Sequence, residues 1–270
     1  MTLTTLQLSE SGRTVALRSV GQGEPLVLIH GVGMQSAAWA PQIAAFSETH
    51  RVIAVDMPGH GGSEPLPHDC RLPEFVAWCG DVLDTLGQGP VNLAGHSMGA
   101  LIAGGVAATQ PQLVRRAALL NGVYRRSETA RQAVLDRAGD IRNGRMDLET
   151  PLARWFGSSP AEEAARAKVA HWLGTVETDG YATAYEAFAH GDATYAPAFG
   201  QIACPFLAIT GEGDPNSTPD MARQMASLVP GGKSAVIAGH RHMINLTAPD
   251  EVNAHLAAWL ARTLHPEAVT

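Results

Sequence analysis

The chain has few cysteines, few charged residues and no long apolar run. Each of these shortages excludes a class of protein or of binding partner. Its three cysteines, Cys70, Cys79 and Cys204, lack the spacing of a zinc site, which favours reduced, packed thiols in a cytoplasmic protein. Charged residues make up only 17% of the 270 residues, and the net charge is −7. We expect no nucleic-acid partner, because phosphate binding needs clustered Lys and Arg.

Membrane segments are also missing from the sequence. No apolar stretch reaches about 18 uninterrupted residues, so we expect no transmembrane helix and no membrane partner. The first residues lack a basic segment followed by an apolar one, so no signal peptide is expected. Hydrophobic residues still make up 45% of the chain, which is enough for one large α/β domain or a domain with an insertion. The sequence leaves the oligomeric state open.

Short apolar runs alternate with helical patterns at both ends of the chain. A hairpin is predicted over residues 3–19, strands over 26–30, 52–56, 91–94, 117–120, 206–210 and 233–238, and helices over 37–46, 73–86, 97–110 and 249–264. Strands separated by helices indicate βαβ units. The predicted fold class is therefore α/β, with a mostly parallel central sheet flanked by helices on both faces.

Strand-like runs disappear between residues 123 and 200, where Ala, Glu, Arg and aromatic residues dominate. This change predicts several helices inserted between two parts of one core, residues 1–122 and 201–270. Three aromatic residues of the insertion, Trp155, Trp172 and Tyr185, are candidates for a substrate pocket and equally for the insertion's own small core. Arg125 and Arg126, which follow the strand at 117–120, could meet a substrate carboxylate, although an exposed position at the domain edge is favoured.

The segment Gly95-His96-Ser97-Met98-Gly99 joins a predicted strand to a predicted helix. Its G-x-S-x-G pattern is typical of a nucleophile elbow, in which the two glycines leave room for a tight turn that exposes the serine. The turn also places Ser97 at a helix N-terminus, where free N–H groups favour negative charge. A chain with 28 glycines can carry this pattern by chance, so the serine could also be inert.

A reactive serine needs a base, a carboxylate that orients the base, and donors for the oxyanion. Asp214 follows the strand at 206–210 in a glycine turn, where it could also be a plain turn former, and Glu212 is a weaker rival. His240 and His242 follow the strand at 233–238 and compete for the role of base. The chain order Ser, Asp, His is the order expected for an α/β-hydrolase.

Two further groups complete the expected site. Backbone N–H groups of Met98, directly after the serine, and of Val32, after the strand at 26–30, are the expected oxyanion donors.

His240 and His242 could also bind zinc, but a catalytic zinc needs a third ligand, and no H-E-x-x-H or comparable pattern supplies one. We therefore expect no metal and no cofactor.

These motifs together resemble the α/β-hydrolase-fold superfamily, in particular its capped esterases, lactonases and C–C hydrolases. The matching segments are residues 30–33, 56–63, 95–99, 211–215 and 242–249. The resemblance implies that the insertion at 123–200 is a helical cap. It also favours His242 over His240, because the family's catalytic histidine commonly lies seven residues before a proline, here Pro249. A glutamate common in the family is replaced by Thr247.

The resemblance implies a cofactor-independent serine hydrolase that cleaves a small carboxylic ester or lactone through an acyl-enzyme. Ser97 is the expected nucleophile, His242 the base and Asp214 the carboxylate that orients it. A C–C bond hydrolase of a vinylogous diketone is the alternative with the same residues. A ligand receptor without turnover is the alternative from another class, since a fold does not determine a function.

Overall fold

A computed structural model describes residues 2–263, which contain one eight-stranded sheet with the strand order β1-β2-β4-β3-β5-β6-β7-β8. The strands are β1 (Thr4–Gln7), β2 (Thr14–Val20), β3 (Glu24–Ile29), β4 (His50–Val55), β5 (Val91–His96), β6 (Val114–Leu120), β7 (Phe206–Gly211) and β8 (Lys233–Ile237). The first hairpin is antiparallel and β2 runs antiparallel to β4, while all the other pairs are parallel. The mostly parallel sheet predicted from the sequence is confirmed.

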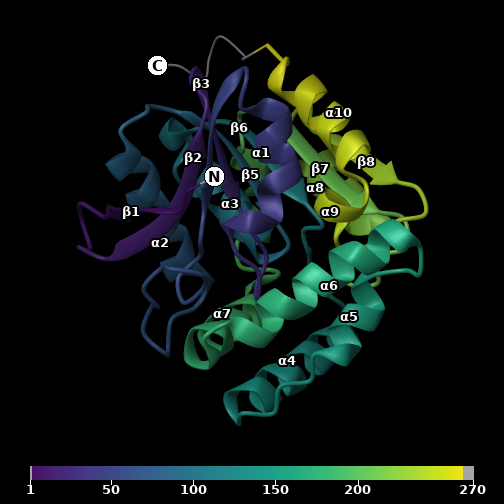
Figure 1. Cartoon of the computed structure of the whole chain (residues 1–270). Helices are drawn as coiled ribbons and strands as arrows, with labels where there is room; N and C mark the ends of the chain where they lie inside the picture. Colours follow the sequence, from purple (N-terminus) through teal and green to yellow (C-terminus); the bar gives the residue numbers. More distant parts are fainter. Residues whose placement is uncertain (1, 264–270) are drawn as a thin grey trace.

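Helices cover both faces of this sheet (Figure 1). One face carries α1 (Ala40–Phe46) and α10 (Pro249–Leu260), with the short α9 (Ile244–Thr247) leading into α10. The other face carries α2 (Leu72–Leu86), α3 (Met98–Thr109) and α8 (Pro219–Leu228). The helix predicted to run to residue 264 ends at Leu260, and residue 264 itself lies outside the described residues.

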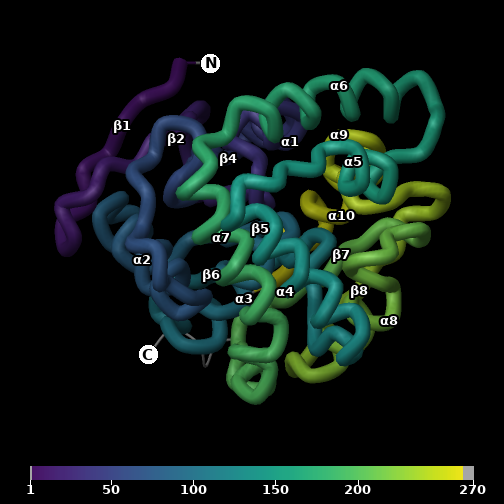
Figure 2. The backbone as a smooth tube through the Cα atoms, turned by 90° about the horizontal axis from the view of Figure 1, so that it is seen from below, coloured from purple at the N-terminus to yellow at the C-terminus, as the bar shows by residue number. Residues whose placement is uncertain are grey.

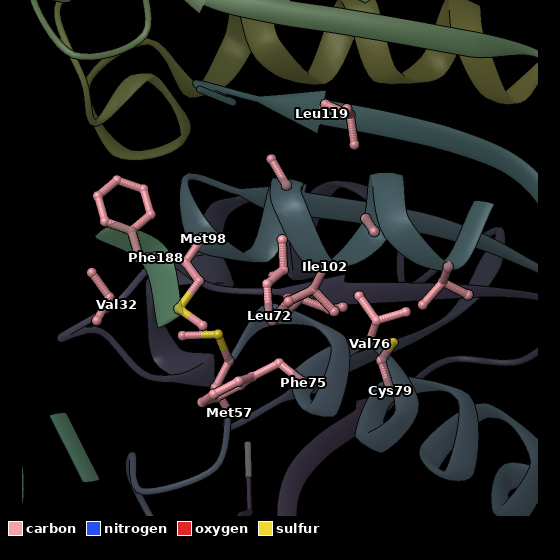
Figure 3. Close-up of a cluster of buried hydrophobic side chains, with 14 of the residues drawn as sticks. Val32, Met57, Leu72, Phe75, Val76, Cys79, Met98, Ile102, Leu119 and Phe188 are labelled. Atoms are coloured by element: carbon pink, nitrogen blue, oxygen red, sulfur yellow. The ribbon is translucent and has the colours of Figure 1, made fainter. Parts of the chain in front are cut away.

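Two apolar cores result from the alternation of side chains along each strand. In β3, Val27 and Ile29 face the core under α2 and α3, whereas Leu26 and Leu28 face the core under α1 and α10. Strands buried on both faces read as continuous apolar runs, which is why the sequence revealed them. Figure 3 shows part of the first core, where the side chains of Met57 and Met98 point toward each other.

The chain between β6 and β7 forms four helices and a 3-10 turn, which together are called the insertion below. They are α4 (Glu128–Arg142), α5 (Glu149–Trp155), α6 (Pro160–Thr175), α7 (Thr178–Gly191) and the 3-10 turn Ala196–Gln201. Ser127 caps α4, and Ser159 with Glu162 forms a capping box at the start of α6. Figures 1 and 2 show the insertion helices grouped on one side of the sheet. The boundaries of a separate cap domain stay a prediction.

All three cysteines are buried and unpaired. Burial raises the pKa of the Cys79 thiol to about 12 and that of Cys204 to about 11, so neither carries a reactive thiolate near neutral pH. None of the helices within residues 2–263 is long and apolar enough to cross a bilayer.

Candidate active site

Ser97 occupies a strained turn between β5 and α3. Its backbone angles, φ 54° and ψ −112°, are rare for a residue with a side chain. A Cβ at Gly95 would overlap the carbonyl of Gly99, and a Cβ at Gly99 would overlap the carbonyl of Ile29. Only glycine therefore fits two residues before and two residues after the serine. The N–H of Ser97 donates to the carbonyl of Leu120 at 2.9 Å.

Asp214 and His242 are paired beside this turn. Asp214 lies just beyond β7, and its Oδ2 accepts a hydrogen bond from His242 Nδ1 at 2.7 Å. Both residues are 3% exposed. His242 and Ser97 line the same cavity, so the structure brings together the three residues expected as nucleophile, carboxylate and base.

Asn121, at the end of β6, holds the carboxylate in place. Its Nδ2 donates to Asp214 Oδ2 at 2.8 Å and to the carbonyl of Arg241 at 3.2 Å. The Asn216 N–H donates to the other carboxylate oxygen at 2.8 Å. Burial raises the pKa of Asp214, but His242 and the hydrogen bonds from His242, Asn121 and Asn216 together lower it below its usual value. Asp214 is therefore ionised near neutral pH.

His96, at the end of β5, contacts His242. Its Nε2 lies 2.8 Å from the carbonyl oxygen of His242, so this nitrogen carries a proton and donates it. Burial and the neighbouring His242 lower the pKa of His96 to about 3, which keeps the ring neutral. No local feature of the sequence signals this contact, because residues 96 and 242 are far apart in the chain.

The loop that carries Val32 is held by two neutral histidines. His60 Nε2 accepts the Gly33 N–H at 2.8 Å, and His30 Nδ1 lies 2.7 Å from the Gly31 carbonyl. Burial lowers the pKa of His30 to about 4 and that of His60 to about 3. Within the described residues, no hydrogen bond uses the N–H of Val32, which leaves it available as an oxyanion donor.

A cavity of about 360 Å³ opens between Ser97 and the insertion. Trp155 and Tyr185 line it, whereas Trp172 does not and packs against the apolar core instead. The prediction of Trp172 as a pocket residue therefore finds no support, because α6 places its side chain elsewhere. Val32 and Phe188 also line the cavity, and Figure 3 shows them at one end of the apolar cluster, near Met98.

Three arginines, Arg126, Arg137 and Arg154, line this cavity, and among its described lining residues there is no Asp or Glu. The expectation of an exposed position holds for Arg125 but is wrong for Arg126, which is only 7% exposed. Asp192, 66 residues away in the chain, accepts the Arg126 N–H at 2.6 Å and forms an ion pair with Nη1 at 3.4 Å.

The guanidinium of Arg126 is only partly hydrogen-bonded. Nη1 faces the carbonyls of Phe188 and Ala189, and the guanidinium lies 4.3 Å from the centre of the Phe188 ring. Nη2 is buried and, among the described residues, has no hydrogen-bond partner. An unsatisfied buried donor is costly, so an acceptor that reached this nitrogen would stabilise the guanidinium.

The other candidate residues lie apart from the pair of Asp214 and His242. His240 Nδ1 contacts Thr247 Oγ1 at 3.0 Å, and exposed Glu212 accepts the Gly239 N–H at 3.0 Å. No group of three or more His, Cys, Asp or Glu residues that could hold a metal ion occurs within residues 2–263.

A parallel sheet with a serine at a strained strand-to-helix turn and a buried Asp–His pair beside it defines the class of α/β hydrolases. The family model described as alpha/beta hydrolase fold matches residues 24–249, and the chain belongs to this family. A relative from Acinetobacter baylyi, (E)-2-((N-methylformamido)methylene)succinate hydrolase, is 54% identical over 259 residues, which cover 96% of this chain and 98% of the relative. The chain is accordingly a hydrolase.

Solved structures show the same fold. The enol-lactonase from Burkholderia xenovorans superposes with a TM-score of 0.85 at 25% identity, covering 96% of this chain and all of that one. E-2-(Acetamidomethylene)succinate hydrolase superposes with a TM-score of 0.79 at 21% identity, covering 97% of this chain and all of that one. At 21% identity the second likeness concerns the fold alone.

Proposed function

We propose that the chain hydrolyses the amide bond of a small N-acyl enamine that carries two carboxylates, of the class of (E)-2-((N-methylformamido)methylene)succinate. The observation that carries this proposal is the 54% identity, over nearly the full length of both chains, to the relative named for that substrate. The ester or lactone predicted from the sequence becomes the second candidate.

The charge of the cavity supports a dianionic substrate. Arg126, Arg137 and Arg154 bring three positive charges to its wall, and Asp192, which also pairs with Arg131, offsets part of the charge of Arg126. Asp147 lies 4.0 Å from the Arg137 guanidinium and is half exposed, so it offsets that charge only weakly. A carboxylate would supply the acceptor that Arg126 Nη2 lacks, and a second carboxylate would face Arg137 or Arg154.

The proposed reaction proceeds in two steps. Ser97 Oγ attacks the acyl carbon while His242 takes its proton, and the oxyanion is bound by the N–H groups of Val32 and Met98. The C–N bond then breaks, His242 returns the proton to the leaving nitrogen, and the acyl group stays on Ser97. Water attacks the acyl-enzyme with His242 as base again, which releases the acid and restores the serine. Asp214 remains ionised and stabilises the imidazolium.

The test is hydrolysis of (E)-2-((N-methylformamido)methylene)succinate by the purified protein, followed as release of formate. We expect turnover that Ser97→Ala lowers at least about 10³-fold. We also expect kcat/KM for the diacid to exceed that for its dimethyl ester at least about 100-fold, because the ester lacks both charges. Equal rates on the diacid and the dimethyl ester would contradict the proposal.

An enol lactone is the second candidate, favoured by the likeness to the enol-lactonase. The same nucleophile and oxyanion donors suit a lactone carbonyl, and ring opening would replace release of an amine. Comparing kcat/KM for an enol lactone and the diacid amide, with Ser97→Ala as the control, distinguishes the two candidates. C–C bond hydrolysis, a receptor role and a cytoplasmic location stay predictions from the sequence.

A further inference from the structure

Trp155, the last residue of α5, lies against the imidazole of His242. The two ring centres are 5.5 Å apart and the planes differ by 28°, which is a stacked arrangement. The ring of His96, 5.1 Å away and tilted by 57°, is a second aromatic neighbour of His242. His96 comes from the sheet, whereas Trp155 comes from the insertion, so the insertion supplies part of the surroundings of the base.

Arg241 ties these two segments together. Its Nη1 donates to the carbonyl of Ala153 at 3.0 Å and to the carbonyl of Phe156 at 2.8 Å, on either side of Trp155. Carbonyls at the end of a helix lack partners within the helix and need donors from elsewhere. Because Arg241 immediately precedes His242 in the chain, it fixes the turn that carries Trp155 to the loop that carries the base.

We propose that Trp155 is a positioning residue for His242 and that Arg241 acts through Trp155. The inference rests on the proposed role of His242 as the base that takes the proton of Ser97. The imidazole then becomes a cation, and the face of an indole ring attracts a cation. The stacked indole also restricts rotation of the imidazole, so both effects favour the transition state more than the bound substrate.

Several charged or titratable groups surround His242. Asp214 is hydrogen-bonded to it, and His96 is a neutral neighbour. The insertion contributes the cavity arginines Arg126, Arg137 and Arg154, and the loop of the base contributes Arg241 and His240. Substitution of Trp155 changes none of these charges, so a change in pH dependence reports the loss of the indole.

The test compares Trp155→Leu and Trp155→Phe with Trp172→Leu, a matched control at the insertion tryptophan outside the cavity. Hydrolysis of p-nitrophenyl acetate between pH 5 and 9 is measured, because this ester needs the nucleophile and base but no carboxylate site. For Trp155→Leu we expect kcat to fall about tenfold with KM changed less than about threefold. Trp155→Phe should recover most of the loss, and Trp172→Leu should behave as the unmodified protein.

The direction of the pH shift separates two roles of the indole. If the indole stabilises the imidazolium, its removal makes protonation of the base harder, and the acid limb of kcat/KM moves to lower pH. If it only excludes water, its removal makes protonation easier, and the limb moves to higher pH. The proposal would be overturned by a shift of the acid limb to higher pH, by a change confined to KM, or by an equal loss of kcat in Trp172→Leu.

A double-mutant cycle tests the role of Arg241. Arg241→Gln alone should lower kcat several-fold, and adding it to Trp155→Leu should cause no further loss. Additive losses would show that Arg241 does not act through Trp155. The ester assay tests the roles of Trp155 and Arg241 whatever the substrate class of the protein is. If the variants lower ester hydrolysis as expected but the protein does not hydrolyse the amide, only the proposed function is refuted. Full ester turnover by Ser97→Ala would refute both.

Discussion

Removal of the Arg126 guanidinium tests the charge of the cavity and the stability of the insertion together. Arg126→Met leaves the buried carboxylate of Asp192 without the more deeply buried of its two cations, and breaking a buried ion pair in this way costs about 3–5 kcal/mol. Arg131 Nη2 remains 3.2 Å from Asp192 Oδ2, and the backbone N–H of residue 126 still donates to the same oxygen. We therefore expect a loss of about 3 kcal/mol in the free energy of unfolding.

The same substitution removes a donor for a substrate carboxylate. A hydrogen bond to a charged group contributes about 1.5–3 kcal/mol, which corresponds to a loss of about 10- to 150-fold in kcat/KM for the diacid. The double variant Arg126→Met/Asp192→Asn removes both charges, and we expect it to regain about 2 kcal/mol of stability without regaining activity.

Urea unfolding followed by circular dichroism and formate release measure the two effects. Arg145→Met is the matched control, because Arg145 is an exposed arginine of the insertion paired with Asp140. It should change stability by no more than about 0.5 kcal/mol. Recovery of full activity along with stability in the double variant would refute the reasoning, because Arg126 would then serve only the fold.

Three further predictions follow from buried groups around the site. Asp214→Asn should lower kcat about 10³–10⁴-fold on any substrate while the protein stays folded by circular dichroism, and a smaller loss would argue against an orienting carboxylate. The three buried neutral histidines take up protons only on unfolding, so stability should fall by up to about 4 kcal/mol per pH unit as pH drops from about 6 to 4.5. His96→Asn should reduce this slope, measured by urea midpoints, by about a third. Gly99→Ala should abolish activity and lower Tm, because its Cβ meets backbone, whereas Gly139→Ala in α4 has open space and should raise Tm.

The strands and the set of Ser97, Asp214 and His242 could be predicted because their signals are local. Each residue follows an apolar run, and the carboxyl ends of parallel strands meet at one edge of the sheet. The helix α8, residues 219–228, was not predicted, because its apolar stripe is short, with only Ala222, Met225 and Ala226 buried.

The wall of the cavity could not be predicted in the same way. The burial of Arg126 depends on Asp192, which directly follows α7 and is 66 residues away in the sequence. Trp155 and Trp172 look equivalent in the sequence, and the packing of α5 and α6 alone decides that the first contacts His242. The sequence therefore located the expected catalytic residues better than the residues that line the cavity.

The burial of every native thiol has a practical consequence. Cys70, Cys79 and Cys204 are all buried, and burial raises the pKa of each of these thiols, so a maleimide at neutral pH should leave the folded protein unlabelled. A single cysteine introduced at an exposed position of α4 would then carry a fluorophore at one defined place. The fluorophore would report any movement of the insertion relative to Ser97 on a chain that keeps its natural core.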